Sequence, residues 1–361
     1  MITLVVIDDS AFMRKAIQLM AESESDIKVI GKARDGLEGV EMVRDLKPDC
    51  VTLDIEMPRM NGLEALDIIM RENPTPVLVV SSISTEGAEV TLEALNKGAA
   101  DFIAKTQSFV AIDITDIKMD LLNKIRTIVK QNKSRPKGYF DVFQRRKERQ
   151  SSLDNGTGLT TDIQLPAGLK EKHYAMVGIG VSTGGPPVIQ HILDNLPADF
   201  PAGILIAQHM PEAFTKPFAD RLNRTCALEV KEAETGDQIS KGSVLIGRGG
   251  KHLIVKRRGN QNYVELNVNP ADLLYHPSAD VLFSSAVEAY GARALGVILT
   301  GMGHDGVLGL KELHNRNGTI VAQDEDSCVV YGMPKAVVDA GIADVVVPAA
   351  DVPAVISNLV E

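Results

Sequence analysis

The stretch A-M-V-G-I-G-V-S-T-G-G-P-P-V-I-Q, residues 175–190, predicts the fold of the second half of the chain. A short apolar run leads into a turn rich in Gly and Pro, and a plausible helix follows over residues 188–196. This strand–turn–helix order is typical of a parallel α/β sheet. One hydroxyl, that of Ser182, lies in the middle of the turn. A phosphate cradle, a nucleophile on a tight turn and an ordinary turn are all compatible with it.

Similar units extend in both directions from this stretch. Short β-branched runs alternate with helical patterns from residue 1 to about 130, and again from about 173 to the end. The chain is therefore predicted to be α/β, with two doubly wound, mainly parallel sheets. The segment L-I-G-R-G-G-K-H-L-I-V, residues 245–255, predicts a hairpin inserted in the second sheet. We expect a first domain over 1–125, a linker over 126–172 and a second domain over 173–361.

The composition excludes several classes of protein. A net charge of −10 and a pI near 5.3 argue against binding to nucleic acid or to an anionic membrane. The N-terminus has no basic segment before its apolar run, and no apolar stretch is long enough to span a bilayer. Three cysteines lie far apart without metal-type spacing. We therefore expect a cytoplasmic protein without membrane insertion. The expected linker begins with a basic run over 130–150, whose role the sequence does not define.

Charged and hydroxyl side chains follow the predicted strands of the first block. The strand ends present Asp8 and Asp9, then Asp54, Ser81 and Lys105. In a parallel sheet these ends meet at one edge. Several carboxylates at one edge favour Mg²⁺, and an added lysine and hydroxyl suit a phosphoryl group. The pattern therefore predicts a phosphoryl-transfer site that uses Mg²⁺.

The whole first block resembles the receiver domain of two-component response regulators. The resemblance is carried by D-D-S at 8–10, V-T-L-D-I-E-M-P-R-M-N-G at 51–62, V-V-S-S at 79–82 and D-F-I-A-K at 101–105. It implies that Asp54 accepts the phosphoryl group from a chemotaxis histidine kinase. It also implies Mg²⁺ ligation by Asp8, Asp9, Asp54 and the backbone carbonyl of Glu56, with Ser81, Lys105 and Phe102 as switch residues. Thr106 replaces the proline that receivers usually have there, which affects the expected placement of Lys105.

The turn at Ser182 lacks what two of the alternatives need. A P-loop requires a lysine after its last glycine, and a dinucleotide fingerprint requires a glycine where Thr183 stands. The literal G-x-S-x-G at 180–184 favours an exposed serine. Later strands lead directly to His209 and to Asp305, and parallel strands would bring all three side chains to one edge. From the residues alone, a Ser–His–Asp triad and an idle turn both remain open.

Residues 173–361 resemble the catalytic domain of the CheB protein-glutamate methylesterases of bacterial chemotaxis. The matching stretches include S-T-G-G-P, I-A-Q-H-M-P, G-V-I-L-T-G-M-G-H-D-G and S-C-V-V-Y-G-M-P. The resemblance implies a catalytic triad of Ser182, His209 and Asp305, with Thr183 and Met302 beside the oxyanion site and no metal there. One departure is Y-H-P-S-A-D at 275–280, where Tyr275-His276 replaces the usual His-Arg; we expect it to affect recognition of substrate carboxylates.

The implied function is a phosphorylation-activated serine hydrolase. It would demethylate glutamate γ-methyl esters, and deamidate glutamines, of methyl-accepting chemotaxis receptors. A receiver-gated hydrolase of another protein ester or thioester is the alternative, because a triad does not name its substrate. A DNA-binding response regulator is disfavoured, since the second block has no helix-turn-helix pattern and the chain is acidic.

Overall fold

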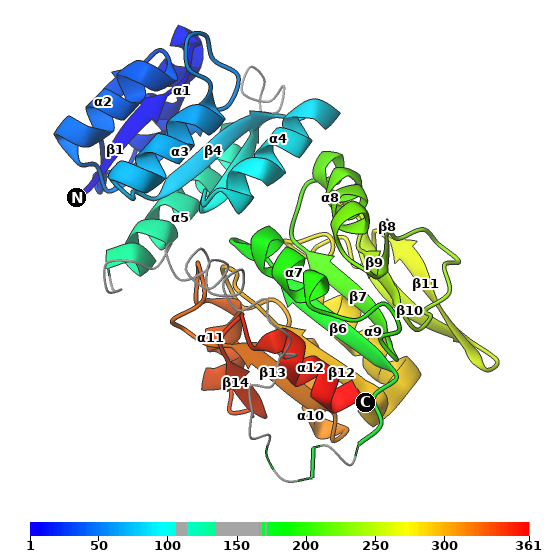
Figure 1. Cartoon of the computed structure of the whole chain (residues 1–361). Coiled ribbons are helices and arrows are strands. Elements are labelled where there is room, and N and C mark those ends of the chain that lie inside the picture. The colour runs from blue at the N-terminus through cyan, green and yellow to red at the C-terminus, as the bar shows by residue number, and fades with distance from the viewer. Residues whose placement is uncertain (106–113, 134–165, 167, 170–171, 361) are drawn as a thin grey trace, which may run out of the picture. The chain divides into compact units, whose positions relative to one another are not determined.

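The chain forms two compact units, residues 1–140 and residues 141–361 (Figure 1). The computed structural model describes residues 1–105, 114–133, 166, 168–169 and 172–360. No helix among these residues is long and apolar enough to cross a membrane.

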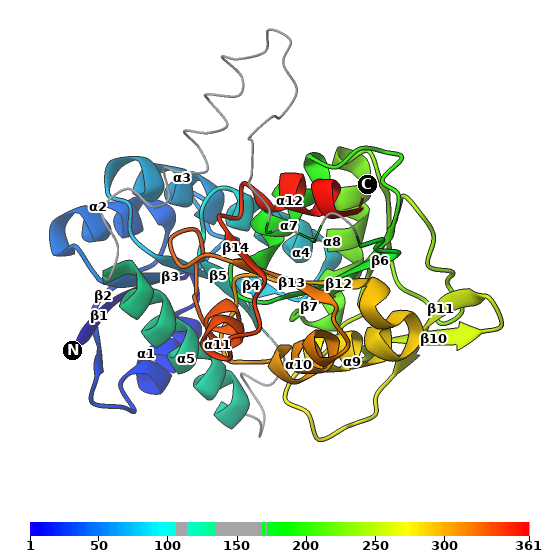
Figure 2. The same ribbon diagram turned by 90° about the horizontal axis from the view of Figure 1, so that it is seen from below.

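The first unit has a parallel sheet with helices on both sides, as predicted. Its strands pair in the order β2-β1-β3-β4-β5, and every pairing is parallel. Helices α1 and α5 lie on one side of the sheet, and α2 and α3 lie on the other (Figure 2). The elements are β1 (Ile2–Ile7), α1 (Ala11–Ala21), β2 (Ile27–Ala33), α2 (Gly36–Leu46), β3 (Cys50–Asp54), α3 (Gly62–Glu72), β4 (Val77–Ser82), α4 (Thr85–Asn96), β5 (Asp101–Lys105) and α5 (Ile114–Lys133).

Local sequence explains why the first unit has these strands and helices. Strand β3 is buried along its whole length, as expected of a central parallel strand covered on both faces. The loop after it leads into α3 through a capping box, in which Asn61 and Glu64 each accept a backbone N–H from the other residue. Helix α5 runs to Lys133 and so crosses the boundary that we predicted at residue 125. The basic run of the expected linker lies mostly in 134–150, outside the described residues.

The second unit contains a larger parallel sheet. Within its described residues, seven strands pair in the order β14-β13-β12-β6-β7-β9-β8, with all pairings parallel. Helices α7 and α12 lie on one side of this sheet, and α9 and α10 lie on the other (Figure 2). The elements are β6 (Met176–Val181), α7 (Gly185–Asp194), β7 (Gly203–Gln208), α8 (Glu212–Thr225), β8 (Glu229–Glu232), β9 (Ser243–Ile246), β10 (His252–Arg258), β11 (Gln261–Asn267), α9 (Ala279–Tyr290), a 3₁₀ turn (Gly291–Arg293), β12 (Ala294–Ile298), α10 (Val307–Asn315), β13 (Thr319–Gln323), α11 (Met333–Asp339), β14 (Val345–Val347) and α12 (Val352–Val360).

An inserted hairpin is present, but the prediction that residues 245–255 form it was wrong. Strand β9 joins the main sheet between β7 and β8, because its apolar run is buried like the other parallel strands. The hairpin is instead β10 paired antiparallel with β11. Its two-residue turn starts at Gly259, whose φ of +61° suits glycine. The Gly-Asn pair at 259–260 is the sequence signal that we overlooked.

A glycine in β6 lets helix α9 approach the sheet closely. A Cβ on Gly180 would lie 2.8 Å from the Cβ of Ala279 and 3.2 Å from the ring of Phe283. Any side chain at Gly180 would therefore push α9 away from the sheet. The close approach brings the first residues of α9 to the edge where β6, β7 and β12 end. This edge carries the second candidate site.

Candidate functional sites

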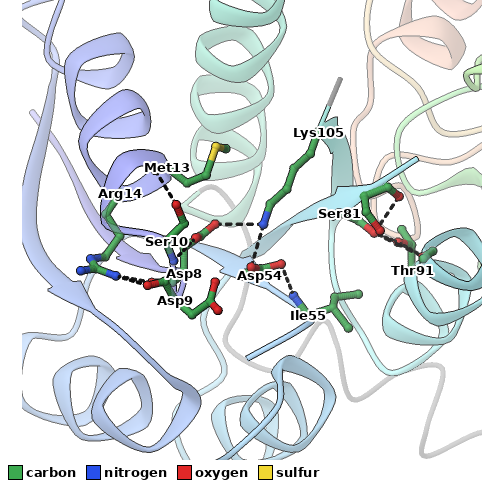
Figure 3. Close-up of polar contacts among 12 residues, drawn as sticks. Asp8, Asp9, Ser10, Met13, Arg14, Asp54, Ile55, Ser81, Thr91 and Lys105 are labelled. Carbon is green, nitrogen blue, oxygen red and sulfur yellow. Dashed lines mark hydrogen bonds and ion pairs between the residues drawn. The ribbon is translucent and has the colours of Figure 1, made fainter. Parts of the chain in front are cut away.

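The carboxylates predicted in the first unit meet at one edge of the sheet. Asp54 ends β3, and Asp8 and Asp9 follow β1. Figure 3 shows the side chain of Lys105 reaching from β5 towards Asp8 and Asp54. Its Nζ lies 2.6 Å from Asp54 Oδ2 and 3.1 Å from Asp8 Oδ2. Lys105 thus lies where the sequence predicted it, whereas Thr106 is outside the described residues.

Burial and the lysine act in opposite directions on these acids. Burial raises the pKa of Asp54 to about 6, although its hydrogen bond to Lys105 opposes the rise. Burial also raises the pKa of Asp8, again against the effect of Lys105. Three acids close together would repel one another when ionised, and a divalent cation would relieve the repulsion.

The three acids fit a magnesium ion. One carboxylate oxygen from each of Asp8, Asp9 and Asp54 lies within 4.8 Å of the others. Oxygen ligands from a few carboxylates, completed by water, are what Mg²⁺ prefers. The carbonyl of Glu56, in the loop after β3, stays a predicted ligand.

The hydroxyl of Ser81 contacts Thr91 on α4 (Figure 3). Thr91 Oγ1 on α4 lies 2.6 Å from Ser81 Oγ, and Ser81 Oγ donates to the carbonyl of Gly87 at 3.2 Å. The structure therefore does not bring Ser81 together with Asp54. The ring of Phe102, the third switch residue that the resemblance implies, is buried, at 5% exposure.

The second unit presents Ser182 on the tight turn between β6 and α7. Gly184, two residues later, has a φ of +76°, which glycine adopts without strain. The backbone N–H of Ser182 donates to the carbonyl of Thr300, 3.0 Å away, so the turn is fixed to the end of β12. The Thr300 hydroxyl in turn donates to the carbonyl of Thr183 at 2.9 Å. The sequence-predicted serine thus lies on a rigid, partly exposed turn.

His209 and Asp305 form a direct pair beside this turn. His209 Nε2 lies 2.7 Å from Asp305 Oδ2, and both side chains are at least nine-tenths buried. The backbone N–H of His209 donates to the carbonyl of Val181, 3.0 Å away. His209 therefore directly follows β7 and lies alongside the serine turn. His304, the neighbour of Asp305 in the sequence, is exposed.

Asp305 is held by the N-terminus of α9. Its carboxylate accepts from the Ser278 hydroxyl at 2.7 Å and from the backbone N–H groups of Ala279 at 2.6 Å and Asp280 at 3.1 Å. Burial alone would raise its pKa, but the hydrogen bonds from His209 and from these donors lower the pKa to about 2. Asp305 is therefore a stable anion, as expected of a carboxylate at a helix N-terminus.

The orientation of the imidazole leaves one nitrogen for the serine. Because Asp305 contacts Nε2, the remaining nitrogen is Nδ1, which is buried and has no hydrogen-bond partner among the described residues. Within the residues that the structure describes, no hydrogen bond joins the Ser182 hydroxyl to His209. Such contacts are often long in the absence of substrate.

The two residues predicted beside the triad lie near the serine turn. Thr183 directly follows Ser182 and is 5% exposed. Met302 is half-buried in the loop after β12. A Cβ on its neighbour Gly301 would lie 2.8 Å from the Cβ of Ser182, which shows how closely the two loops approach.

Sequence reasoning did not predict the roles of Gln208 and Ser278 in this site, and it assigned Tyr275 to substrate recognition. The side-chain amide of Gln208 donates to the carbonyls of Ser182 at 3.1 Å and His209 at 3.2 Å, and so joins the two turns. Ser278 caps α9 and also contacts Asp305. Tyr275 stacks on the ring of His209. Gln208 directly precedes His209 in the sequence, and this was the available signal for its role.

Comparison with known proteins places both units in established families. The family model described as CheB methylesterase matches residues 177–356, and the response regulator receiver domain model matches residues 4–117. A Nitratidesulfovibrio vulgaris protein named protein-glutamate methylesterase/protein-glutamine glutaminase 2 is 50% identical over 363 residues, covering 99% of each chain. A Thermotoga maritima protein named protein-glutamate methylesterase/protein-glutamine glutaminase is 41% identical, covering 99% of this chain and 98% of its own.

A solved structure supports the fold of the second unit. The crystal structure of the Thermotoga maritima CheB methylesterase catalytic domain matches with a TM-score of 0.51 and 41% identity. It covers 52% of this chain and 100% of that domain. The doubly wound, mainly parallel sheet predicted for residues 173–361 is therefore confirmed.

Proposed function

The chain belongs to the CheB methylesterase family, and from this premise we propose that Ser182, His209 and Asp305 are its catalytic triad. The chain is a protein-glutamate methylesterase and protein-glutamine glutaminase that carries a receiver domain and acts in chemotaxis adaptation. The observation that carries the triad is the short bond from His209 Nε2 to Asp305, which leaves Nδ1 without a hydrogen-bond partner among the described residues, in a histidine whose backbone N–H donates to Val181 next to the serine.

The triad would catalyse acyl transfer in two steps. Nδ1 of His209 takes the Ser182 proton as Oγ forms a bond to the γ-carbonyl carbon of the esterified glutamate. The bond from this carbon to the methoxy oxygen then breaks, and the imidazolium protonates the leaving methanol. A water molecule, activated by the same nitrogen, attacks the acyl-enzyme and releases glutamate and free Ser182. With a glutamine substrate the leaving group would be ammonia.

Asp305 would act through His209 and not on the substrate. Its ionised carboxylate, anchored by α9, accepts the Nε2–H and so leaves Nδ1 unprotonated and able to act as a base. The same negative charge would stabilise the imidazolium that forms in the first step. We propose that backbone N–H groups near Thr183 and Met302 stabilise the oxyanion, because these loops flank Ser182.

In the receiver, we propose Asp54 as the phosphoacceptor. Mg²⁺ would be held by Asp8, Asp9, Asp54 and the carbonyl of Glu56, and it would neutralise charge on the phosphoryl group when bound. Lys105 would contact a phosphoryl oxygen, since its Nζ already lies 2.6 Å from Asp54. Ser81 would have to leave Thr91 to reach the same group.

We further propose that phosphorylation of the receiver raises the esterase activity. The phosphodonor would be a chemotaxis histidine kinase, and the substrates would be methyl-accepting chemotaxis receptors. A two-state equilibrium between restrained and active forms moves tenfold for each ~1.4 kcal/mol of differential stabilisation. The domain limits that we propose remain 1–125, 126–172 and 173–361, although α5 continues to Lys133.

Methanol release from methylated receptor membranes tests the triad. Ser182→Ala removes one hydroxyl from a partly exposed position, so the variant should fold and take up phosphate at Asp54 normally. Its methanol release should fall by at least about a thousandfold. Turnover within tenfold of the unmodified protein would exclude Ser182 as the nucleophile.

A further inference from the structure

The ring of Tyr275 lies flat on the imidazole of His209. The two ring centroids are 4.0 Å apart and the ring planes differ by 7°. Tyr275 belongs to the segment between β11 and α9 and is half-buried. The sequence predicted that this segment affects recognition of substrate carboxylates, but the contact that the structure shows is with the base.

His209 is thus contacted in two directions. Asp305 holds its Nε2 edge, 2.7 Å away, and the aromatic ring covers one of its faces. A single hydrogen bond at Nε2 would still let the ring tilt about the line from Nε2 to Asp305. The stacked ring blocks this tilt, because a rotated imidazole would collide with the tyrosine.

We propose that Tyr275 is a positioning residue for His209 in the esterase reaction; this inference rests on the proposed role of His209 as the base. The stack keeps Nδ1 aimed at Ser182. It also places the electron-rich face of an aromatic ring against the imidazolium that forms when Nδ1 takes the serine proton. Aromatic faces attract cations, most strongly where water is excluded. Both effects act on the chemical step and not on substrate binding.

The ring, and not its hydroxyl, should carry the effect. The stack involves the aromatic face, and phenylalanine would preserve it. The variant Tyr275→Phe should therefore keep kcat within about twofold of the unmodified protein, because it retains the cation–aromatic contact. Tyr275→Leu, which keeps an apolar side chain without a ring, should lower kcat about tenfold with KM unchanged.

The experiment measures kcat and KM for methanol release from methylated receptor membranes, with the full-length protein. Tyr263→Leu is the matched control. Tyr263 lies on β11 against Arg258, and its replacement removes the same aromatic ring at another place in the same unit. Tyr275→Met is measured in parallel, and thermal unfolding confirms which variants are folded. Leucine and methionine variants that lower kcat, with rescue by phenylalanine and no effect of the control, support the inference.

Three results would overturn it. One is an unchanged kcat in folded Tyr275→Leu and Tyr275→Met. Another is a raised KM with unchanged kcat, which would mean that Tyr275 contacts substrate. The third is an equal loss in Tyr275→Phe, which would assign the effect to the hydroxyl. Ser182→Ala is assayed alongside: if it retains activity, the proposed triad is wrong, whereas its inactivity with an active Tyr275→Leu would reject only the role of Tyr275.

Discussion

Replacing Asp305 by asparagine should nearly abolish catalysis, for a reason that the hydrogen bonds define. The carboxylate accepts four bonds: Oδ2 from His209 Nε2 and the N–H of Ala279, and Oδ1 from the Ser278 hydroxyl and the N–H of Asp280. An asparagine has one acceptor and one donor there. Whichever way its amide is turned, one of the two backbone N–H groups faces an NH₂ group.

In one of these two orientations, with the amide oxygen towards Ser278 and the N–H of Asp280, the base loses its tautomer. If the NH₂ group faces His209, Nε2 has to accept, so the proton moves to Nδ1, and Nδ1 can no longer act as the proposed base. In the chymotrypsin family the corresponding change lowers kcat about ten-thousandfold. We expect a loss of about a thousandfold to ten-thousandfold here, at unchanged KM, in methanol release from methylated receptor membranes.

The same variant should also lose stability in a defined pH range. The pKa of Asp305 falls from the ordinary value of 3.8 to about 2 on folding, mainly because donors outweigh the cost of burial. This drop corresponds to about 2–3 kcal/mol at pH 7, at about 1.4 kcal/mol per pKa unit. A lowered pKa stabilises the fold above the unfolded value, so the contribution is complete above about pH 4 and disappears as the pH falls towards 2. Asp305→Asn should lack it.

Asp339→Asn is the matched control, because Asp339 is an exposed carboxylate of the same unit that forms an ion pair with Lys335, one turn earlier on α11. It should change neither methanol release nor unfolding. Turnover of folded Asp305→Asn within tenfold of the unmodified protein would refute the assignment of Asp305 as the residue that orients the base.

Two further predictions concern the receiver. Asp54→Asn should take up no phosphate from a small phosphodonor with Mg²⁺, and the donor should no longer raise methanol release; labelling equal to that of the unmodified protein would mean that another residue is the acceptor. Thr91→Val removes the hydroxyl that lies 2.6 Å from Ser81 Oγ, so Ser81 is released more easily towards Asp54. It should bind the phosphoryl analogue beryllofluoride about fivefold more tightly in a titration with Mg²⁺, and weaker binding would contradict the idea that Thr91 restrains Ser81.

The sequence could place the residues that follow strands, because parallel strands end at a common edge. This rule brought together Asp8, Asp54 and Lys105 in one unit, and His209 with Asp305 in the other. The rule needs only the identity of the strands, and their buried β-branched runs are clear in the sequence. It depends on no side-chain rotamer.

The rule fails where a side-chain rotamer or a loop decides the contact. Ser81 ends β4 as expected, yet its hydroxyl is turned to Thr91 on α4, and no strand pattern specifies that rotamer. Tyr275 and Ser278 come from the segment before α9, and their contacts depend on how closely the helix approaches β6. That approach depends on the missing side chain at Gly180. The effect of Gly180 on the site cannot be read from the sequence, because it requires the packing of α9 on β6.

The contacts of the base with its carboxylate bear on how phosphorylation can control the esterase. The donors that fix Asp305 are His209, Ser278 and the first residues of α9, all within the second unit. The turn that carries Ser182 is likewise held by Thr300 and Gln208 of the same unit. The receiver is therefore not needed to orient the base or to keep Asp305 ionised. Under the control through Asp54 that we propose, phosphorylation would act on access of the substrate to Ser182, or on the last approach of the serine hydroxyl to Nδ1. The first would change mainly KM and the second kcat, so the kinetic parameter that phosphorylation changes distinguishes them.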